Sequence, residues 1–279
     1  SCITAVGYCT LSNNTTGAGN TAMGFYAARC NTTGLYNTAV GLCSLYSNVS
    51  GCYNTAFGHE AARVTTGNGN TALGDRSMYT NSTGTRNTAS GRCTMFYNTT
   101  GSNNTASGFG ALKCNTTGCR NTATGQMSLM HNTTASCSTA TGMYSLYSNT
   151  TGTRNTATGY FSLGDNTTGT CNTASGFYAL LNNTTGSYNT AVGTLALQAN
   201  TTGNKNTAMG MIALYDNTTG NCNTAVGYQA SKSNTTGLYS TSVGFQSLYS
   251  NTTGANNTAS GMYSLRNNTT GNYNTAFGY

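Results

Sequence analysis

The stretch "NTTGTRNTATG", residues 149–159, contains both elements that predict the fold of this chain. Asn149 opens an Asn-Thr-Thr-Gly segment, whose small polar residues are typical of a turn. Thr156 opens a Thr-Ala-x-Gly segment, and Thr is common in strands. Asn149 also fits the N-glycosylation acceptor pattern Asn-x-Ser/Thr, whereas Asn155 does not, because Ala157 stands at the third position. The stretch therefore predicts a short strand that follows a glycine turn.

The Thr-Ala-x-Gly segment recurs along the whole chain. It begins at Thr4, and its copies follow every 17 residues, except for one interval of 16 residues between Thr55 and Thr71. One repeat reads T-A-x-G-x-x-(A/S/T)-L-x-x-N-T-T-G-x-x-N, and its positions are numbered here 1 to 17 from the Thr. The short repeat is interpreted as having lost the Asn before its Thr-Thr-Gly. Ala135 replaces the turn Gly of one repeat, and Ser242 replaces the Ala of another.

Such a short period cannot bury a core within one repeat, but stacked repeats can. Helical repeats need about 33–47 residues, and Thr, Asn and Gly are poor helix formers. The sequence therefore predicts an all-β fold, a parallel β-solenoid (β-roll) of sixteen 17-residue coils plus a partial one. Residues 1–279 are expected to form a single repeat array, a segment of a longer fibre, since the chain begins inside the repeat.

The composition limits the classes of function. The hydrophobic fraction of 37% is below the usual range of about 45–50%, which argues against one large apolar core. The net charge of +7 is spread thinly and forms no basic patch, so nucleic-acid binding is not expected. No apolar run approaches the roughly 18–20 residues of a membrane span, and none is predicted.

Several positions of the repeat have predictable places in a solenoid. Small residues at positions 2 and 7 and Gly at position 4 indicate close approach of chain segments. Position 3 alternates between apolar and hydroxylated blocks and is interpreted as a surface or intersubunit stripe. Positions 5, 6, 9 and 16 carry most of the Tyr and are expected to point outward or contact other chains. The apolar position 8 is assigned to the core, which includes Leu45, Leu112, Leu129, Leu146, Leu163, Leu180, Leu197 and Leu214.

Two Asn columns run along the repeats. Position 17, including Asn20, Asn37, Asn54, Asn155 and Asn172, is expected to form a structural ladder of stacked amides. All fifteen Asn at position 11 satisfy Asn-x-Ser/Thr, and they are the candidate glycosylation sites. An inward turn would show the same pattern, and glycans on every coil would be crowded at a spacing of about 4.8 Å. The candidates are Asn14, Asn31, Asn48, Asn81, Asn98, Asn115, Asn132, Asn149, Asn166, Asn183, Asn200, Asn217, Asn234, Asn251 and Asn268.

Few residues offer catalytic chemistry. In register, Glu60 would pair with Arg76 and Asp75 with Arg92, which predicts an ion-pair ladder beside His59. No nucleophile or metal-ligand spacing accompanies this group, so the chain is not expected to be an enzyme or to hold a cofactor or metal. The eleven Cys form no disulfide framework, although Cys114 and Cys119 flank one turn and could pair, and the odd count leaves at least one thiol unpaired within the chain.

The segment "NTAVGYQA" (Asn223 to Ala230), followed by "SNTTG", resembles the repeats of YadA-like trimeric autotransporter heads. It is still more similar to repeat arrays of phage tail fibres that end in an intramolecular chaperone domain. The resemblance implies a left-handed parallel β-roll, often homotrimeric, that serves as a shaft or adhesive head on a virion or cell surface. The 17-residue period, the many Cys and the lack of a recognisable stalk, anchor or chaperone segment depart from that pattern.

These observations predict a structural subunit of an extracellular fibre or filament at a cell or virion surface. It would be homo-oligomeric, as a trimer or filament, and could carry covalent N-glycans. One alternative is an adhesin or phage-type receptor-binding fibre that contacts cell-surface carbohydrate. Another is an ice-binding β-solenoid, because Thr columns at strand spacing suit ordered water. Outward Tyr residues that could stack on sugars, or pack between chains, are Tyr46, Tyr147, Tyr215 and Tyr249.

Overall fold

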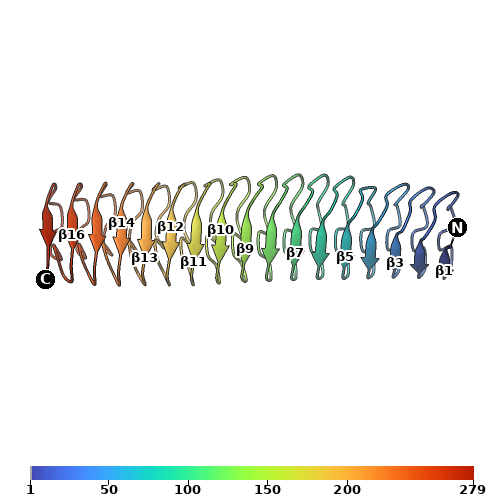
Figure 1. Cartoon of the computed structure of the whole chain (residues 1–279), viewed down its shortest axis with the longest axis horizontal. Helices are drawn as coiled ribbons and strands as arrows, with labels where there is room; N and C mark the ends of the chain where they lie inside the picture. The colour runs from blue at the N-terminus through green and yellow to red at the C-terminus, as the bar shows by residue number, and fades with distance from the viewer. Residues whose placement is uncertain (1) are drawn as a thin grey trace. The chain divides into compact units, whose positions relative to one another are not determined.

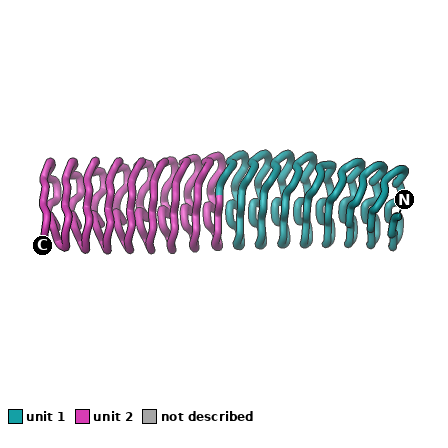
Figure 2. The backbone as a smooth tube through the Cα atoms, viewed as in Figure 1, with its two compact units in different colours: residues 1–138 teal, residues 139–279 magenta. Residues whose placement is uncertain are grey.

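A computed structural model describes residues 2–279, which fall into two compact units. The first unit extends to Ser138 and the second begins at Thr139, so the division between them coincides with the start of a repeat (Figure 2). Each unit is a parallel β-solenoid in which one repeat makes one coil (Figure 1). The described residues contain no helix, and the predicted fold class is confirmed.

Every coil contributes one strand of three residues at positions 1 to 3. In the first unit the strands are β1 (Thr4–Val6), β2 (Thr21–Met23), β3 (Thr38–Val40), β4 (Thr55–Phe57), β5 (Thr71–Leu73), β6 (Thr88–Ser90), β7 (Thr105–Ser107) and β8 (Thr122–Thr124). In the second they are β9 (Thr139–Thr141), β10 (Thr156–Thr158), β11 (Thr173–Ser175), β12 (Thr190–Val192), β13 (Thr207–Met209), β14 (Thr224–Val226), β15 (Thr241–Val243), β16 (Thr258–Ser260) and β17 (Thr275–Phe277).

Strands of neighbouring coils pair in parallel, with identical repeat positions opposite each other. Thr173 of β11 faces Thr190 of β12, and Ala174 faces Ala191. The same register holds across the short repeat, where Thr55 of β4 faces Thr71 of β5. Each column of the sequence repeat is therefore a column of neighbouring side chains within a unit.

The core is a narrow column with one large apolar side chain at position 8 in most coils, and Ala28, Ala62 and Ser231 occupy this position in the other described ones. The position-8 residues Leu45, Leu112, Leu129, Leu146, Leu163, Leu180, Leu197 and Leu214 are all fully buried. Small residues complete the core, with Ala or, in one coil, Ser242 at position 2 and with Ala, Ser or Thr at position 7. Burying one Leu contributes about 1.5–3 kcal/mol. Hydrogen bonds between polar groups must therefore supply much of the stability of each coil.

The position-4 glycines let successive coils approach closely. At Gly176 the backbone has a φ of +140°, and an added Cβ would lie 2.5 Å from the carbonyl oxygen of Gly193 in the next coil. That atom is backbone and cannot move aside without shifting the coil. The column therefore needs Gly both for its φ and for the space.

Three other positions have a positive φ although most of their residues are not Gly. In one coil these are Phe161 at position 6, Leu163 at position 8 and Cys171 at position 16, with φ values of 51°, 50° and 57°. A left-handed backbone costs an L-residue roughly 1–2 kcal/mol. The coil is thus a strained path that contacts with neighbouring coils must stabilise.

The short repeat loses a different residue from the one inferred from the sequence. Thr65 occupies the place of the position-11 Asn, because it is fully buried and its Oγ1 accepts a hydrogen bond of 3.0 Å from Asn81 Nδ2. The amide of Thr66 then bonds to the carbonyl of Ser82 at position 12. The deletion therefore removes a turn Thr, and Thr65 replaces the Asn.

Candidate functional site

The position-11 Asn side chains form a buried ladder along each unit. Asn183 Nδ2 donates to Oδ1 of Asn166 in the previous coil at 2.7 Å and to the carbonyl of Gly186 in its own turn at 2.9 Å. Asn183 Oδ1 in turn accepts from Asn200 Nδ2 at 2.8 Å. The Asn183 amide therefore closes its own turn and joins two neighbours, a pattern that is interrupted in the first unit at the short repeat, where Asn81 donates to Thr65.

The position-17 Asn side chains form a second ladder. Asn172 Nδ2 donates to the carbonyl of Gly186 at 2.8 Å, and Asn172 Oδ1 accepts from the backbone amide of Asn189 at 2.9 Å. The backbone amide of Asn172 donates to Asn155 Oδ1, also at 2.9 Å. Equivalent bonds link Asn20, Asn37 and Asn54. The Gly186 carbonyl is thus bound from both ladders at once.

The burial of position 11 bears on the candidate glycosylation sites. Thirteen of the fifteen side chains are at most 1% exposed, and Asn14 and Asn268 are half-buried. Nδ2 is the atom to which an N-glycan is attached, and in this ladder it carries hydrogen bonds inside the coil. The folded coils do not present this column outward, which favours the interpretation of position 11 as an inward turn. Glycosylation of these Asn residues stays a prediction, to be tested by chemical analysis.

The charged residues around the short repeat form a surface network. Arg76 Nε lies 2.9 Å from Glu60 Oε2, and Arg92 Nε lies 3.4 Å from Asp75 Oδ2. His59 Nδ1 contacts Asp75 Oδ1 at 2.8 Å. The hydrogen bond to Glu60 raises the pKa of the Arg76 guanidinium. Exposed pairs of this kind stabilise by only about 0–1 kcal/mol each, so the network contributes little to folding.

The cysteines and acidic residues assemble no further centre among residues 2–279. All eleven Cys are free thiols in the structure, including Cys114 and Cys119. Burial raises the pKa of the Cys43 and Cys114 thiols. No group of three or more His, Cys, Asp or Glu side chains in this range could hold a metal ion, and no helix in it is long and apolar enough to cross a bilayer.

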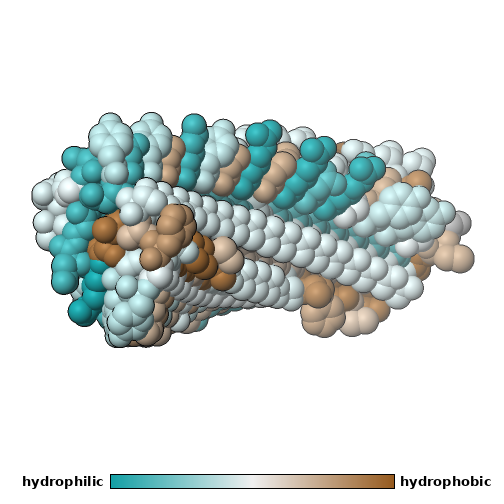
Figure 3. Space-filling model, turned by 60° about the vertical axis from the view of Figure 1, so that its left-hand side comes forward, coloured by the Kyte–Doolittle hydropathy of each residue, from teal (hydrophilic) through white to brown (hydrophobic). Residues whose placement is uncertain are grey.

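The outer face of the strands presents two side chains per coil, at positions 1 and 3. On β6, β7 and β8 of the first unit, and on β9, β10 and β11 of the second, both are Thr or Ser. The Ala between them is buried, as in the exposed-buried-exposed pattern of β10. Figure 3 shows straight rows of side chains of near-neutral hydropathy, the range of Thr, Ser and Gly. These coils present regular hydroxyl rows.

On other strands position 3 is apolar and exposed. In the first unit Val6, Met23 and Phe57 are 53%, 46% and 59% exposed. Val192, Met209 and Val243 occupy the same position in the second unit and are also exposed. Exposed apolar patches of this kind on soluble proteins often mark contacts with other molecules.

The Tyr residues expected to point outward at position 9 are half-buried. Tyr46 lies between two arginines, with the Arg29 and Arg63 guanidinium carbons 5.9 and 5.5 Å from its ring centroid. Tyr249 is similarly placed between Lys232 and Arg266. Tyr147 and Tyr215 are also half-buried. The Tyr46 and Tyr249 rings contact cations of their own chain, which leaves less of their faces for a sugar.

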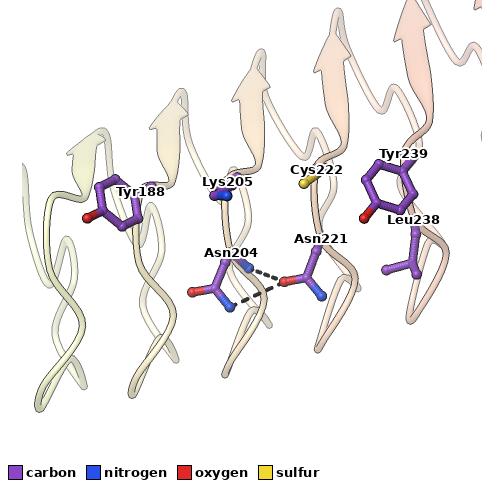
Figure 4. Close-up of a pocket in the computed structure, with 7 residues that line it drawn as sticks. All are labelled: Tyr188, Asn204, Lys205, Asn221, Cys222, Leu238 and Tyr239. Atoms are coloured by element: carbon purple, nitrogen blue, oxygen red, sulfur yellow. Dashed lines mark hydrogen bonds between the residues drawn. The ribbon is translucent and has the colours of Figure 1, made fainter.

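A pocket on the second unit involves Tyr residues of a different column. Its volume is about 400 Å³, and it is lined by Tyr188, Asn204, Lys205, Asn221, Cys222, Leu238 and Tyr239 (Figure 4). All of these residues occupy positions 15 and 16. Sequence reasoning placed position 16 outward but did not single out this site. The in-register order Tyr, Lys, Cys, Tyr in that column was the available signal.

A search against protein-family models and a search of curated proteins each found no match to this chain.

Proposed function

We propose that the chain is a structural subunit of an extracellular fibre that assembles with further copies of itself. The observation that carries this proposal is the Gly186 carbonyl, bound from both Asn ladders in an arrangement that recurs from coil to coil. Such a structure gains stability from the contacts that each added repeat makes with its neighbour, and these ladder contacts recur along the chain and are not gathered at one centre. The likeness to YadA-like heads and phage tail-fibre arrays supports a place on a cell or virion surface.

Self-association is proposed to use the apolar part of the position-3 column. Its side chains Met23 and Phe57 lie exposed on β2 and β4, and a second copy would bury them. Three- or two-fold packing would each satisfy this, so the number of chains is an outcome of the test. Covalent glycans are not needed for the proposal.

Analytical ultracentrifugation of the chain and of a Met23→Ser, Phe57→Ser variant tests this directly. Serine already stands at position 3 in β6 and β7, so the variant should keep its fold and its circular dichroism spectrum. The parent chain should sediment as an oligomer and the variant as a monomer. A parent that stays monomeric up to about 100 μM would contradict self-association, since stable interfaces correspond to micromolar affinity or better.

Ice binding is a second candidate, favoured by the paired hydroxyl rows. Hydroxyls at positions 1 and 3 recur about 6.6–6.8 Å apart along a strand and about 4.8 Å apart between coils, a regular array for ordered water. An ice-recrystallisation assay should show inhibition that Thr141→Lys on β9 abolishes. The control Thr168→Lys changes an exposed Thr in the turn and should leave it intact. No inhibition by the parent chain eliminates this candidate.

A catalytic role is not proposed. His59 contacts Asp75 at the surface, in a network that arginines also share. A substrate screen in which His59→Ala abolishes a measured turnover would overturn the structural assignment.

A further inference from the structure

The pocket on the second unit lies between two aromatic rings of one column. Tyr188 and Tyr239 occupy position 16 three coils apart, about 14 Å at the usual strand spacing. They are 60% and 61% exposed, so most of each ring is open to solvent. Lys205 and Cys222 occupy position 16 in the two coils between these rings, and neither side chain fills the space that an aromatic ring would occupy (Figure 4).

Neighbouring rings in this column stack when both are present. In the first unit Tyr36 and Tyr53 lie in adjacent coils with ring centroids 5.3 Å apart and planes inclined by 17°. The column therefore holds rings in a stacked arrangement. Interrupting it with Lys205 and Cys222 leaves a gap bounded by an aromatic side chain at each end, which is suited to a ligand that itself has rings.

The side of the pocket is polar and fixed in position. Asn221 Oδ1 accepts from the Asn204 backbone amide at 2.7 Å and from Asn204 Nδ2 at 3.3 Å. Asn221 Nδ2 donates to the carbonyl of Thr219 at 2.9 Å. These bonds hold both amides in place before any ligand arrives, which lowers the entropic cost of binding.

The face that carries the pocket has cations but no carboxylates. All four acidic residues of the chain, Glu60, Asp75, Asp165 and Asp216, stand at positions 5, 6 or 10, and none at positions 15 or 16. Every ion pair found among residues 2–279 involves Glu60 or Asp75. The Lys205 ammonium has neither a hydrogen bond nor an ion pair within the described chain, so its charge is available to an anion.

We propose that this pocket binds an acidic oligosaccharide, a short run of pyranose rings that carries at least one carboxylate. Tyr188 and Tyr239 would pack against ring faces, as aromatic side chains with a large apolar surface do. Lys205 would pair with the carboxylate, and the Asn204 and Asn221 amides would lie beside the sugar hydroxyls. This inference goes beyond the structural role and does not depend on self-association.

Carbohydrate is favoured over single-stranded nucleic acid by the number of cations. A nucleic acid carries a phosphate at every nucleotide, and proteins that bind it combine stacking rings with a positively charged groove along the backbone. The pocket contains one cation, Lys205, across three coil steps. That matches one carboxylate among several neutral rings.

Isothermal titration calorimetry with tri-galacturonate and with a neutral galactose trisaccharide tests the proposal. The acidic trisaccharide should bind at least tenfold more tightly than the neutral one, and added salt should weaken it. A chain that does not bind tri-galacturonate, or that binds both sugars equally, would overturn the proposal. Tighter binding of a short oligothymidylate would overturn it in favour of nucleic acid.

Three variants with the same replacement separate the pocket from general electrostatics. Asn256 already occupies position 16 with a φ of 58°, so Asn is compatible with this backbone. Lys205→Asn and Tyr239→Asn should each weaken tri-galacturonate at least tenfold at an unchanged unfolding temperature. Arg154→Asn removes a cation from the same column outside the pocket and should change binding less than twofold. An equal loss for Arg154→Asn and Lys205→Asn would show that overall charge, not the pocket, attracts the ligand.

Discussion

Replacing Asn183 by Ala should destabilise the second unit by about 2–6 kcal/mol. The substitution removes three hydrogen bonds, to Asn166, Gly186 and Asn200. Asn166 Oδ1 loses the partner that the structure gives it, and a buried polar atom left unsatisfied costs roughly 1–3 kcal/mol. The Gly186 carbonyl and Asn200 Nδ2 each keep one partner, through Asn172 and Gly203, so each lost bond adds about 0.5–1.5 kcal/mol.

The matched control is the preceding residue. Asn182 is half-buried, and no hydrogen bond of its side chain is found within residues 2–279. Asn182→Ala makes the same change of side chain at the adjacent position of the same coil. It should cost less than about 0.5 kcal/mol, as surface substitutions usually do.

Urea denaturation followed by circular dichroism measures both variants, with backbone hydrogen exchange of the affected coil as a local readout. For an m-value near 3 kcal/mol/M, at the upper end for urea, a loss of about 2–6 kcal/mol lowers the midpoint by roughly 0.7–2 M. Hydrogen exchange should quicken first at Thr184 and Thr185, whose backbone amides donate to the carbonyl of Thr201 in the next coil. Equal midpoints for Asn183→Ala and Asn182→Ala would refute the assignment of position 11 to a stabilising ladder.

Four further changes test other parts of the coil. Gly176→Ala should cost at least about 3 kcal/mol in thermal unfolding or prevent folding, because its Cβ would clash with the Gly193 carbonyl. The control Gly110→Ala should cost only about 1–2 kcal/mol, because the nearest neighbour of its Cβ would be Met127 Cγ at 3.6 Å. Cys171→Gly should raise the unfolding temperature through a gain of up to about 1 kcal/mol, because Gly accepts the φ of 57° without strain; a lower temperature would contradict this. Thr65→Asn should stabilise the first unit by about 1–3 kcal/mol, since Asn48 Oδ1 has no hydrogen-bond partner in the described chain and a neighbouring amide would supply one; an unchanged urea midpoint would count against the repair. Alkylation at pH 8 should modify the exposed Cys137 faster than Cys114, whose thiol pKa is raised by burial; equal rates by peptide mass spectrometry would contradict this.

The solenoid and its core column could be predicted because each sequence repeat forms one coil, so that equivalent residues of successive repeats lie next to one another. A residue such as Leu180 recurs at one position, and in-register pairing places its equivalents one above another. Glu60 and Arg76 could be paired in the same way. The argument needs only the period and the burial of the apolar column, both of which can be read from the sequence.

The orientation of position 11 could not be read from the sequence, because an exposed acceptor and an inward turn share the pattern Asn-x-Thr. What distinguishes them is the position of the Gly186 carbonyl, which Asn183 reaches at 2.9 Å. The positive φ of residues such as Leu163 and Phe161 could not be predicted from the sequence either, because neither residue type favours a positive φ. The replacement in the short repeat depended on where Thr65 points, and the pocket depended on what Lys205 leaves empty.

The strain and the ladders of one coil are similar in size, which explains why the coils depend on one another. Three left-handed residues, such as Phe161, Leu163 and Cys171, cost roughly 3–6 kcal/mol together. The two Asn of a coil form about four side-chain bonds at about 1 kcal/mol each. Burial of one Leu adds about 2 kcal/mol. An isolated coil would keep the strain but lose most bonds and the burial, since these are made to the next coil. Coils therefore form only against a neighbour, and a defect in one ladder must weaken the coils on both sides of it.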